Sequence, residues 1–200
     1  AYDIFTHTAH VTAAVPPVPT LRWAALLHDV GKVATFTQDA NGRGHFYTHA
    51  SVSARMADDI LRRLKAPTQL REQAVSLIAH HMTRLEPEKK LLRRRLSRLG
   101  ADTVGQLLAL QQADMGSKGT GNREEMEQFP RIRELLDAIR QQEACLSLRD
   151  LKINGNDLIA LGLRGREIGT TLEHLLDQVL EGTLPNQREA LLEAADPQKP

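Results

Sequence analysis

A nearly continuous apolar stretch close to the N-terminus places the strongest constraint on how this chain folds. Residues 21–30 contain seven apolar side chains and no polar face, so the pattern predicts a helix buried on almost all sides. The same stretch carries His28 and Asp29. Burying a carboxylate without compensation costs on the order of several kcal/mol. We therefore expect a cationic group beside Asp29, either a metal ion or a nearby lysine or arginine in an internal ion pair.

The composition is that of a globular protein with one main core. The chain has 200 residues, of which 41% are hydrophobic, which suffices for one domain or for one domain with a small appendix. A single cysteine, Cys145, offers no disulfide framework and suits a reducing compartment. Since the sequence has no apolar run of about 20 residues and no secretory signal pattern, we expect a soluble cytoplasmic protein without a membrane partner. The net charge of +1 argues neither for nor against nucleic acid.

Helical periodicity dominates the sequence and predicts an all-α fold. We expect helices at residues 2–14, 20–30, 46–65, 68–82, 87–99, 102–115 and 122–143, with Pro130 breaking or starting a helix. Residues 37–45 are rich in turn formers and predict a surface loop. The expected domains are a helical bundle at residues 1–146 and a small helical tail at 147–200. In the tail, an apolar stripe predicts a buried helix face, and Asn186 with Glu189 predicts a capping box; the stripe comprises Ile168, Leu172, Leu175, Leu176 and Val179.

Histidines and aspartates recur in apolar surroundings on separate predicted helices. Helices that converge in a bundle bring such side chains to one interior point, as in the metal sites of bundle cores. Imidazole and carboxylate ligands together favour a first-row transition metal such as Fe, Mn, Zn, Ni or Co. An ordinary, half-buried polar role is the better interpretation for His10 and His174, and His45 stays open. The candidate ligands are His7, His28, Asp29, His49, His80 or His81, and Asp114.

These residues carry a family resemblance. The pattern H…HD…H…HH…D with the HDxGK continuation resembles the HD superfamily of metal-dependent phosphohydrolases. Further, LRWAALLHDVGK, GRGHFYTHASVSA and INGNDLIALGLRGREIG resemble the HD-containing C-terminal half of bacterial CCA-adding tRNA nucleotidyltransferases, over nearly the whole chain. Family members usually carry Gly and Glu on either side of the histidine that corresponds to His49, where this chain has Thr48 and Ala50.

The nucleotidyltransferase half of such enzymes is missing from this sequence. That half needs paired carboxylates for two Mg ions after a Gly-Ser phosphate turn, and no G-S-x-x-D-x-D pattern occurs here. The chain starts at Ala1, without a methionine, inside a predicted helix. We therefore expect a piece of a longer protein, continuous with an N-terminal nucleotidyltransferase head, that adds no nucleotides on its own.

The resemblance implies a metal-dependent phosphohydrolase with one or two divalent ions, Mg included. His7, His28, Asp29 and Asp114 would bind a first ion, and Asp29 would bridge to a second ion held by His49 and by His80 or His81. The implied catalytic residues are Asp29, Lys32 and His81, with His81 acting as a ligand or as an acid. The implied substrates are 2',3'-cyclic nucleotides, 2'-nucleotides or simple phosphate esters.

The alternative function is a non-catalytic tRNA-binding body or tail, in which the metal site is structural or vestigial. Cations crowd one predicted helix, and a glycine-flanked helix start at residues 165–169 offers free N–H groups to a phosphate. A solvated helix face explains the same cations equally well. The few aromatic residues favour duplex RNA over unpaired bases. The candidate RNA-binding residues are Lys89, Lys90, Arg93, Arg94, Gly165 and Arg166.

Overall fold

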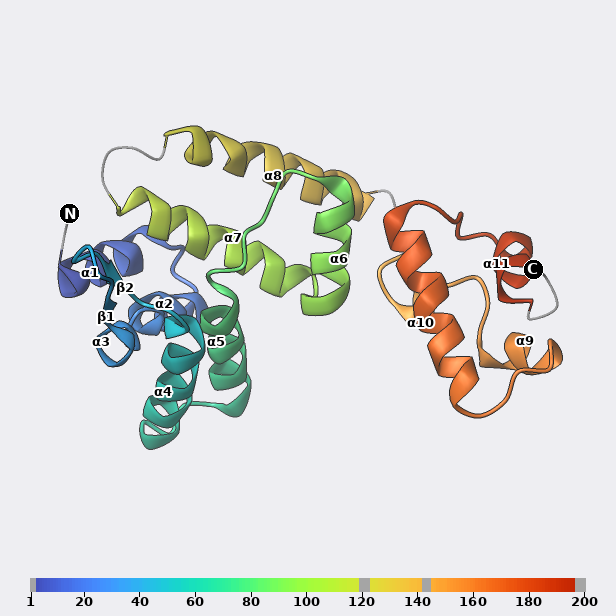
Figure 1. Cartoon of the computed structure of the whole chain (residues 1–200), viewed down its shortest axis with the longest axis horizontal. Coiled ribbons are helices and arrows are strands. Elements are labelled where there is room, and N and C mark those ends of the chain that lie inside the picture. The colour runs from blue at the N-terminus through green and yellow to red at the C-terminus, as the bar shows by residue number, and fades with distance from the viewer. Residues whose placement is uncertain (1–2, 119–122, 142–144, 197–200) are drawn as a thin grey trace. The chain divides into compact units, whose positions relative to one another are not determined.

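A computed structural model describes residues 3–118, 123–141 and 145–196 (Figure 1). The described chain is mostly helical, which confirms the predicted all-α class. A small antiparallel hairpin pairs Thr37 with His45 and Gln38 with Gly44. The elements are α1 (Ile4–Ala14), α2 (Pro19–Leu27), α3 (Lys32–Thr35), β1 (Thr37–Gln38), β2 (Gly44–His45), α4 (His49–Arg63), α5 (Thr68–His80), α6 (Lys89–Leu99), α7 (Ala101–Gly116), α8 (Arg123–Gln141), the 3-10 turn η1 (Leu148–Asp150), α9 (Gly155–Ala160), α10 (Arg166–Glu181) and α11 (Arg188–Ala195).

The chain forms two compact units. The first contains residues up to 85 together with 101–130, and the second contains residues 86–100 together with 131–200. The expected division of function at residue 146 stays a prediction. Among the described residues, no helix has both the length and the apolar character needed to cross a membrane.

The first unit is a bundle in which α2 is surrounded by neighbours. Helix α2 contacts α1, α4, α5 and α7, while α5 packs on α4 and α7 (Figure 1). The helices meet through fully buried aliphatic side chains, which exclude water from the bundle interior; these include Val11, Leu21, Ala24, Leu61, Leu77, Ile78, Leu107 and Leu110. The ends of these helices consequently converge on one interior region.

Helix α2 is shorter and less buried than its sequence predicts. It ends at Leu27 with His28 as its C-cap, so the His28–Asp29 pair lies in the turn before α3 and not inside a helix that extends to residue 30. Leu26 is 42% exposed and Trp23 is half-buried. The expectation of burial on almost all sides is therefore wrong, because neighbouring elements leave part of α2 open to solvent.

The region predicted as a loop at residues 37–45 contains the β1–β2 hairpin. The side chain of Asp39 accepts hydrogen bonds from the backbone N–H groups of Asn41 and Arg43, both at 2.9 Å, and so closes the turn. With two residues per strand, the hairpin is too short to show an alternating pattern in the sequence.

In the second unit, α10 supplies the apolar face that organises the C-terminal core. The predicted stripe is confirmed: Leu175 is fully buried, and Ile168, Leu172, Leu176 and Val179 pack against the same cluster. The other buried members are Cys145, Leu151, Ile153, Leu158, Leu163, Leu191 and Ala195.

Two local expectations for helix ends are wrong. Helix α11 begins after Gln187 without a side-chain cap, and Asn186 instead accepts a hydrogen bond from the backbone N–H of Lys152 and donates one to the carbonyl of Asp150. Asn186 thus joins two loops and caps no helix. Helix α8 runs through Pro130, which stands inside it and is exposed. Proline removes one helical hydrogen bond, and here the helix continues despite that loss.

Candidate metal centre

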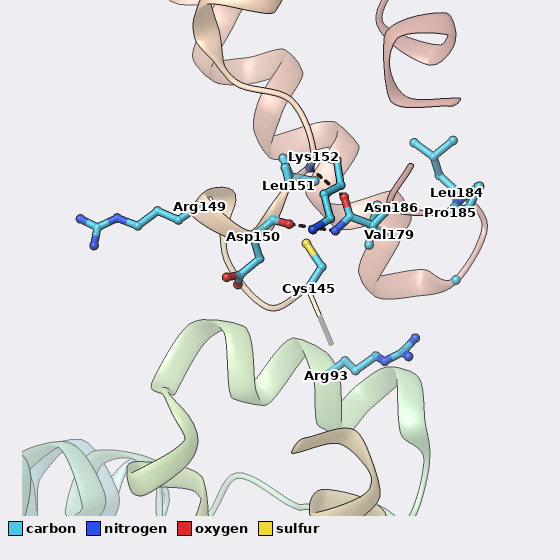
Figure 2. Close-up of a pocket in the computed structure, with 11 residues that line it drawn as sticks. Arg93, Cys145, Arg149, Asp150, Leu151, Lys152, Val179, Leu184, Pro185 and Asn186 are labelled. Carbon is cyan, nitrogen blue, oxygen red and sulfur yellow. Dashed lines mark hydrogen bonds between the residues drawn. The ribbon is translucent and has the colours of Figure 1, made fainter. Parts of the chain in front are cut away.

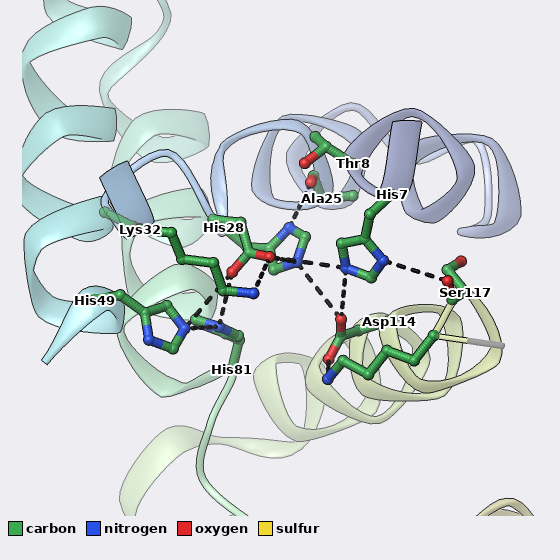
Figure 3. Close-up of polar contacts among 12 residues, drawn as sticks. His7, Thr8, Ala25, His28, Lys32, His49, His81, Asp114 and Ser117 are labelled. Carbon is green, nitrogen blue, oxygen red and sulfur yellow. Dashed lines mark hydrogen bonds and ion pairs between the residues drawn. The ribbon is translucent and has the colours of Figure 1, made fainter. Parts of the chain in front are cut away.

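Four histidine rings and two carboxylates converge inside the first unit (Figure 3). Each comes from a different stretch of the bundle, because the ends of its helices meet there. His7 lies on α1, His28 and Asp29 lie in the turn after α2, His49 begins α4, His81 is the C-cap of α5, and Asp114 lies near the end of α7.

Asp29 stands at the centre of the group. Its Oδ2 lies 3.3 Å from Nε2 of His28 and 3.7 Å from Nε2 of His7. Its Oδ1 lies 3.6 Å from Nε2 of His49 and 3.9 Å from Nε2 of His81. The two oxygens of one buried carboxylate therefore face two separate pairs of histidines.

The backbone fixes which nitrogen each histidine presents to the centre. Nδ1 of His28, His49 and His81 lies 2.7, 2.8 and 2.7 Å from the carbonyl oxygens of Ala25, Phe46 and Ile78. Nδ1 of His7 lies 3.4 Å from the carbonyl of Ser117. A ring that donates Nδ1–H to a carbonyl presents an unprotonated Nε2, which is how metal-binding histidines are oriented in proteins.

With all four rings neutral, this orientation would leave electron pairs facing one another. Nε2 of His49 and Nε2 of His81 lie 3.2 Å apart. Within the described residues, Nε2 of His28 and Oδ1 of Asp29 are buried without a hydrogen-bond partner. Such unpaired acceptors are costly in a protein interior unless a cation lies among them. The donor set fits a divalent metal ion.

The alternative cation, a lysine, is also present but satisfies only half of the carboxylate. Lys32, one turn past Asp29, places Nζ 2.6 Å from Oδ2. Among the described residues, the charged partners of Oδ1 are histidines alone. The internal ion pair therefore exists, yet it does not account for the four converging rings.

Burial and neighbouring charges have opposite effects on the pKa values of Asp29 and His28. Burial raises the pKa of Asp29, but His28 and Lys32 lower it more, so this pKa lies well below its usual range. Burial lowers the pKa of His81 to about 4, which keeps the ring neutral. Burial also opposes protonation of His28, but the nearby carboxylates of Asp114 and Asp29 prevail and raise its pKa to about 9. A metal ion at this ring would displace a proton.

The donor atoms form two overlapping groups that share Asp29. His7, His28 and Asp29 make one group, and Asp29, His49 and His81 make the other, with all donor atoms of each group within 4.8 Å of one another. Asp114 adds a carboxylate oxygen 3.0 Å from Nε2 of His7. The pKa of Asp114 is also below its usual range: burial raises it, but His28 and Lys118 lower it more.

His80 lies outside both groups, half-buried at the end of α5. The sequence left His80 and His81 open as alternatives for the second ion. Of these two neighbours, the structure brings His81 to Asp29.

The centre opens to solvent through a pocket of about 320 Å³. Asp29, His49 and His81 line it together with Lys32 and Lys118. Lys118 places Nζ 2.5 Å from Oδ2 of Asp114. The rest of the wall comes from the hairpin region, with Arg43, Gly44, His45, Phe46 and Tyr47. The motif stretch GRGHFYTHASVSA contains these five residues, but sequence reasoning assigned only His49 of that stretch to the site.

The remaining histidines are not among the converging donor atoms, although His45 lines the pocket. His10 is exposed on α1, and His174 is exposed on α10, where it contacts Gln178. His45, left open by the sequence, pairs with Asp39 at 2.9 Å in the hairpin.

The candidate RNA-binding residues of the second unit divide between ion pairs and open surface. Lys90 and Arg94 both pair with Glu181 of α10. Lys89 begins α6, while Gly165 and Arg166 begin α10 and are exposed.

Arg93 lines a cavity of about 930 Å³ within the second unit (Figure 2). Arg149 and Lys152 lie on the same cavity, and none of these three cations forms an ion pair with the described residues. The guanidinium Nε of Arg93 is buried without a partner there. No sequence pattern predicts this cavity, because α6, η1 and the end of α10 are distant in the chain.

Together, the helical fold and the histidine–carboxylate centre define a helical domain built around a candidate metal site. The chain matches the family described as tRNA nucleotidyltransferase domain 2 over residues 35–195 and belongs to that family. It is 37% identical to a CC-adding tRNA nucleotidyltransferase of Thermus thermophilus over 84% of the chain and 38% of that relative. It is 32% identical to an A-adding tRNA nucleotidyltransferase of Deinococcus radiodurans over 85% of the chain and 40% of that relative.

A shorter match joins the chain to a multifunctional CCA protein of Aromatoleum aromaticum, with 40% identity over 36% of the chain and 17% of that relative. The chain thus spans about two fifths of the length of the first two relatives. These findings confirm the resemblance to tRNA nucleotidyltransferases, while membership of the HD superfamily stays a prediction.

Proposed function

We propose that this chain is an HD-type, metal-dependent phosphohydrolase domain within a tRNA nucleotidyltransferase-related protein. The observation that carries the proposal is the convergence of four histidine Nε2 atoms on the two oxygens of buried Asp29. Lys32 and Lys118, which line the pocket, support the proposal, because a phosphate ester would bring negative charge there.

The ligands would be His7, His28, Asp29 and Asp114 for one ion and Asp29, His49 and His81 for a second. A bound Ni, Mn, Fe, Co or Zn ion, or Mg, would make a water molecule acidic enough to serve as nucleophile and would neutralise charge on the phosphate. The shared carboxylate of Asp29 makes either occupancy, one ion or two, compatible with the donor set.

The protein's own charges would position the substrate. Lys32 reaches Asp29 and also lines the pocket, so its ammonium can contact a phosphate oxygen beside the centre. Lys118 lies across the pocket next to Asp114. Both cations would attract a phosphate ester or a 2',3'-cyclic phosphodiester and hold its charged group against the ligands.

Hydrolysis of 2',3'-cyclic AMP with added Ni or Mn tests this proposal. We expect turnover by the wild-type chain, and loss of both turnover and bound metal in Asp29→Ala. The matched pair is His81→Gln against His80→Gln: the first removes a group that faces Asp29, and the second changes its neighbour outside the centre. Equal activity of the two variants, or turnover that survives in Asp29→Ala, would refute the proposed site.

A second candidate function, tRNA binding, is favoured by the cationic cavity of the second unit. The cavity combines Arg93, Arg149 and Lys152, and Arg and Lys are the residues that neutralise backbone phosphates. The carboxylate of Asp150 lies nearby but accepts hydrogen bonds from Leu146 and Ser147. In this case the metal centre would be structural or vestigial.

Titration of duplex RNA into the chain, across a salt series, tests this second function. Replacing Arg93, Arg149 and Lys152 together by Gln is expected to weaken binding and to reduce the salt slope by about three. The control is Arg62→Gln, which removes one exposed arginine that pairs with Asp58 in the first unit. Unchanged affinity and slope in the triple variant would rule out this surface.

A further inference from the structure

We propose that His45 and Tyr47 form a stacking platform for the base of a nucleotide whose phosphate lies at the metal centre. This inference rests on the proposed phosphohydrolase function and deepens it, because it makes a nucleotide, and not a simple phosphate ester, the favoured substrate. It assigns the choice of substrate to the hairpin and the residues that follow it.

The platform consists of two parallel rings. The rings of His45 and Tyr47 lie 5.1 Å apart between centroids with an interplanar angle of 9°. Parallel aromatic rings stack face to face, and the ring of a nucleobase can stack on such a pair as a third layer. The two residues flank Phe46, whose own ring contacts Phe36 in a tilted arrangement.

The platform is held in place before any ligand binds. Nε2 of His45 lies 2.9 Å from Oδ2 of Asp39, and the other oxygen of that carboxylate accepts the backbone N–H groups of Asn41 and Arg43. The pairing of β1 with β2 also sets His45 opposite Thr37. A surface ordered beforehand binds a ring at a lower entropic cost than a mobile one.

Tyr47 is open to a ligand. Its side chain is 69% exposed, although it is one of the largest apolar groups in the first unit. Within the described residues, no hydrogen bond engages its hydroxyl. The outer part of this ring therefore lies in water, where stacking with a nucleobase would remove apolar surface from solvent.

The platform lies in the same pocket as the proposed metal ligands. His45 and Tyr47 line the same 320 Å³ pocket as Asp29, His49 and His81. Lys32 and Lys118 lie on that pocket near the ligands and suit the phosphate. A nucleotide has an anionic phosphate and an aromatic base. The pocket offers two lysines for the phosphate and two stacked rings for the base.

The test compares two monoesters that differ in the base, 2'-AMP and glycerol 2-phosphate. Stacking on an aromatic residue is worth about 1–3 kcal/mol per base, so Tyr47→Leu is expected to lower the ratio of kcat/KM for 2'-AMP over glycerol 2-phosphate by about 5- to 150-fold. The loss should fall on KM. Tyr47→Phe should retain the ratio, because it keeps the ring.

The matched control is Phe5→Leu, which removes another aromatic ring of the first unit, 82% exposed on α1 and away from the pocket. It should leave the ratio unchanged. Turnover of both substrates with an unchanged ratio in Tyr47→Leu would overturn the platform and leave the phosphohydrolase proposal standing.

If wild-type protein hydrolyses neither ester and also fails to hydrolyse 2',3'-cyclic AMP, the phosphohydrolase proposal fails, and binding then decides the platform. Isothermal titration of 2'-AMP and of glycerol 2-phosphate into wild type and Tyr47→Leu measures the same preference without turnover. A preference for 2'-AMP that Tyr47→Leu abolishes supports stacking, whereas equal preference in both proteins contradicts it.

Discussion

At the scale of single residues, the backbone next to a proposed ligand is strained. Thr48 precedes His49 and has φ of +63°, a left-handed conformation that β-branched residues rarely adopt. Its side chain does not cap α4. Glycine, which the resembled family usually carries at this position, adopts this conformation freely. The departure noted in the sequence therefore has a physical consequence.

Replacing Thr48 by Gly should stabilise the protein by about 1 kcal/mol, because the left-handed conformation costs a branched residue about 1–2 kcal/mol. Urea unfolding of the metal-free chain measures the difference. Thr103→Gly, within α7, is the control and should give no gain. A lower midpoint for Thr48→Gly would show that the threonine contributes contacts that outweigh the strain.

The thiol of Cys145 gives a residue-scale prediction in the second unit. Burial and the nearby charge of Asp150 raise its pKa to about 11, although Lys152 opposes the shift. Since the thiolate is the reactive form, alkylation by iodoacetamide should be slow at pH 7.5 and should rise about tenfold per pH unit. Glutathione in the same buffers is the reference thiol. A rate that levels off below pH 9.5 would be incompatible with this environment.

The sequence alone could not decide whether His80 or His81 lies beside Asp29. The residues are adjacent, and the surrounding pattern predicts that both lie on one helix. The structure ends α5 at His80, and only the cap residue His81 turns toward Asp29. A helix end can shift by one or two residues without a sequence signal, so its cap cannot be assigned from the pattern alone.

At the scale of elements, the close approach of the α2–α3 turn to α4 positions the centre. Gly31 donates its backbone N–H to Oγ of Ser53 at 2.9 Å. A Cβ atom on Gly31 would lie 2.7 Å from the backbone nitrogen of Ser53 and 2.8 Å from the carbonyl oxygen of His49. The glycine of the HDxGK motif therefore lets Asp29 and His49 come within reach of one another.

Gly31→Ala should destabilise the chain by about 1–3 kcal/mol, as overpacking does, and should weaken metal binding by separating the two elements. Chemical denaturation and metal titration measure both effects. Gly169→Ala is the control, since a Cβ there meets nothing within 4 Å and alanine favours the α10 helix. Normal metal affinity in Gly31→Ala would mean that the turn can move without disturbing the ligands.

Elements with long periodic patterns were predictable, and short ones were not. The stripe on α10 identified a buried face because five apolar residues repeat at helical spacing. The hairpin depends on two residue pairs, and the role of Asn186 depends on hydrogen bonds to a distant loop. Neither leaves a periodic pattern in the sequence. Likewise, the chain continues its helix through Pro130 where local preference alone predicts a boundary.

At the scale of the whole molecule, the sequence pointed to the buried histidines and aspartates that converge, but not to their surroundings. Candidate ligands stood out because buried histidine and aspartate need compensation that an apolar stretch cannot supply. The pocket walls did not stand out, since Arg43, Tyr47 and Lys118 are ordinary surface residues in the sequence. The same holds for the cationic cavity of the second unit, assembled from distant segments.

The measurement that tests the account most directly is elemental analysis of the purified chain after equilibration with Mn or Ni, beside Asp29→Ala. We predict one or two equivalents of metal in the wild type and none in the variant, because both ligand groups share that carboxylate. Circular dichroism would confirm that the variant is folded. A folded wild-type chain that takes up no metal, or a variant that retains it, would contradict a metal centre at Asp29.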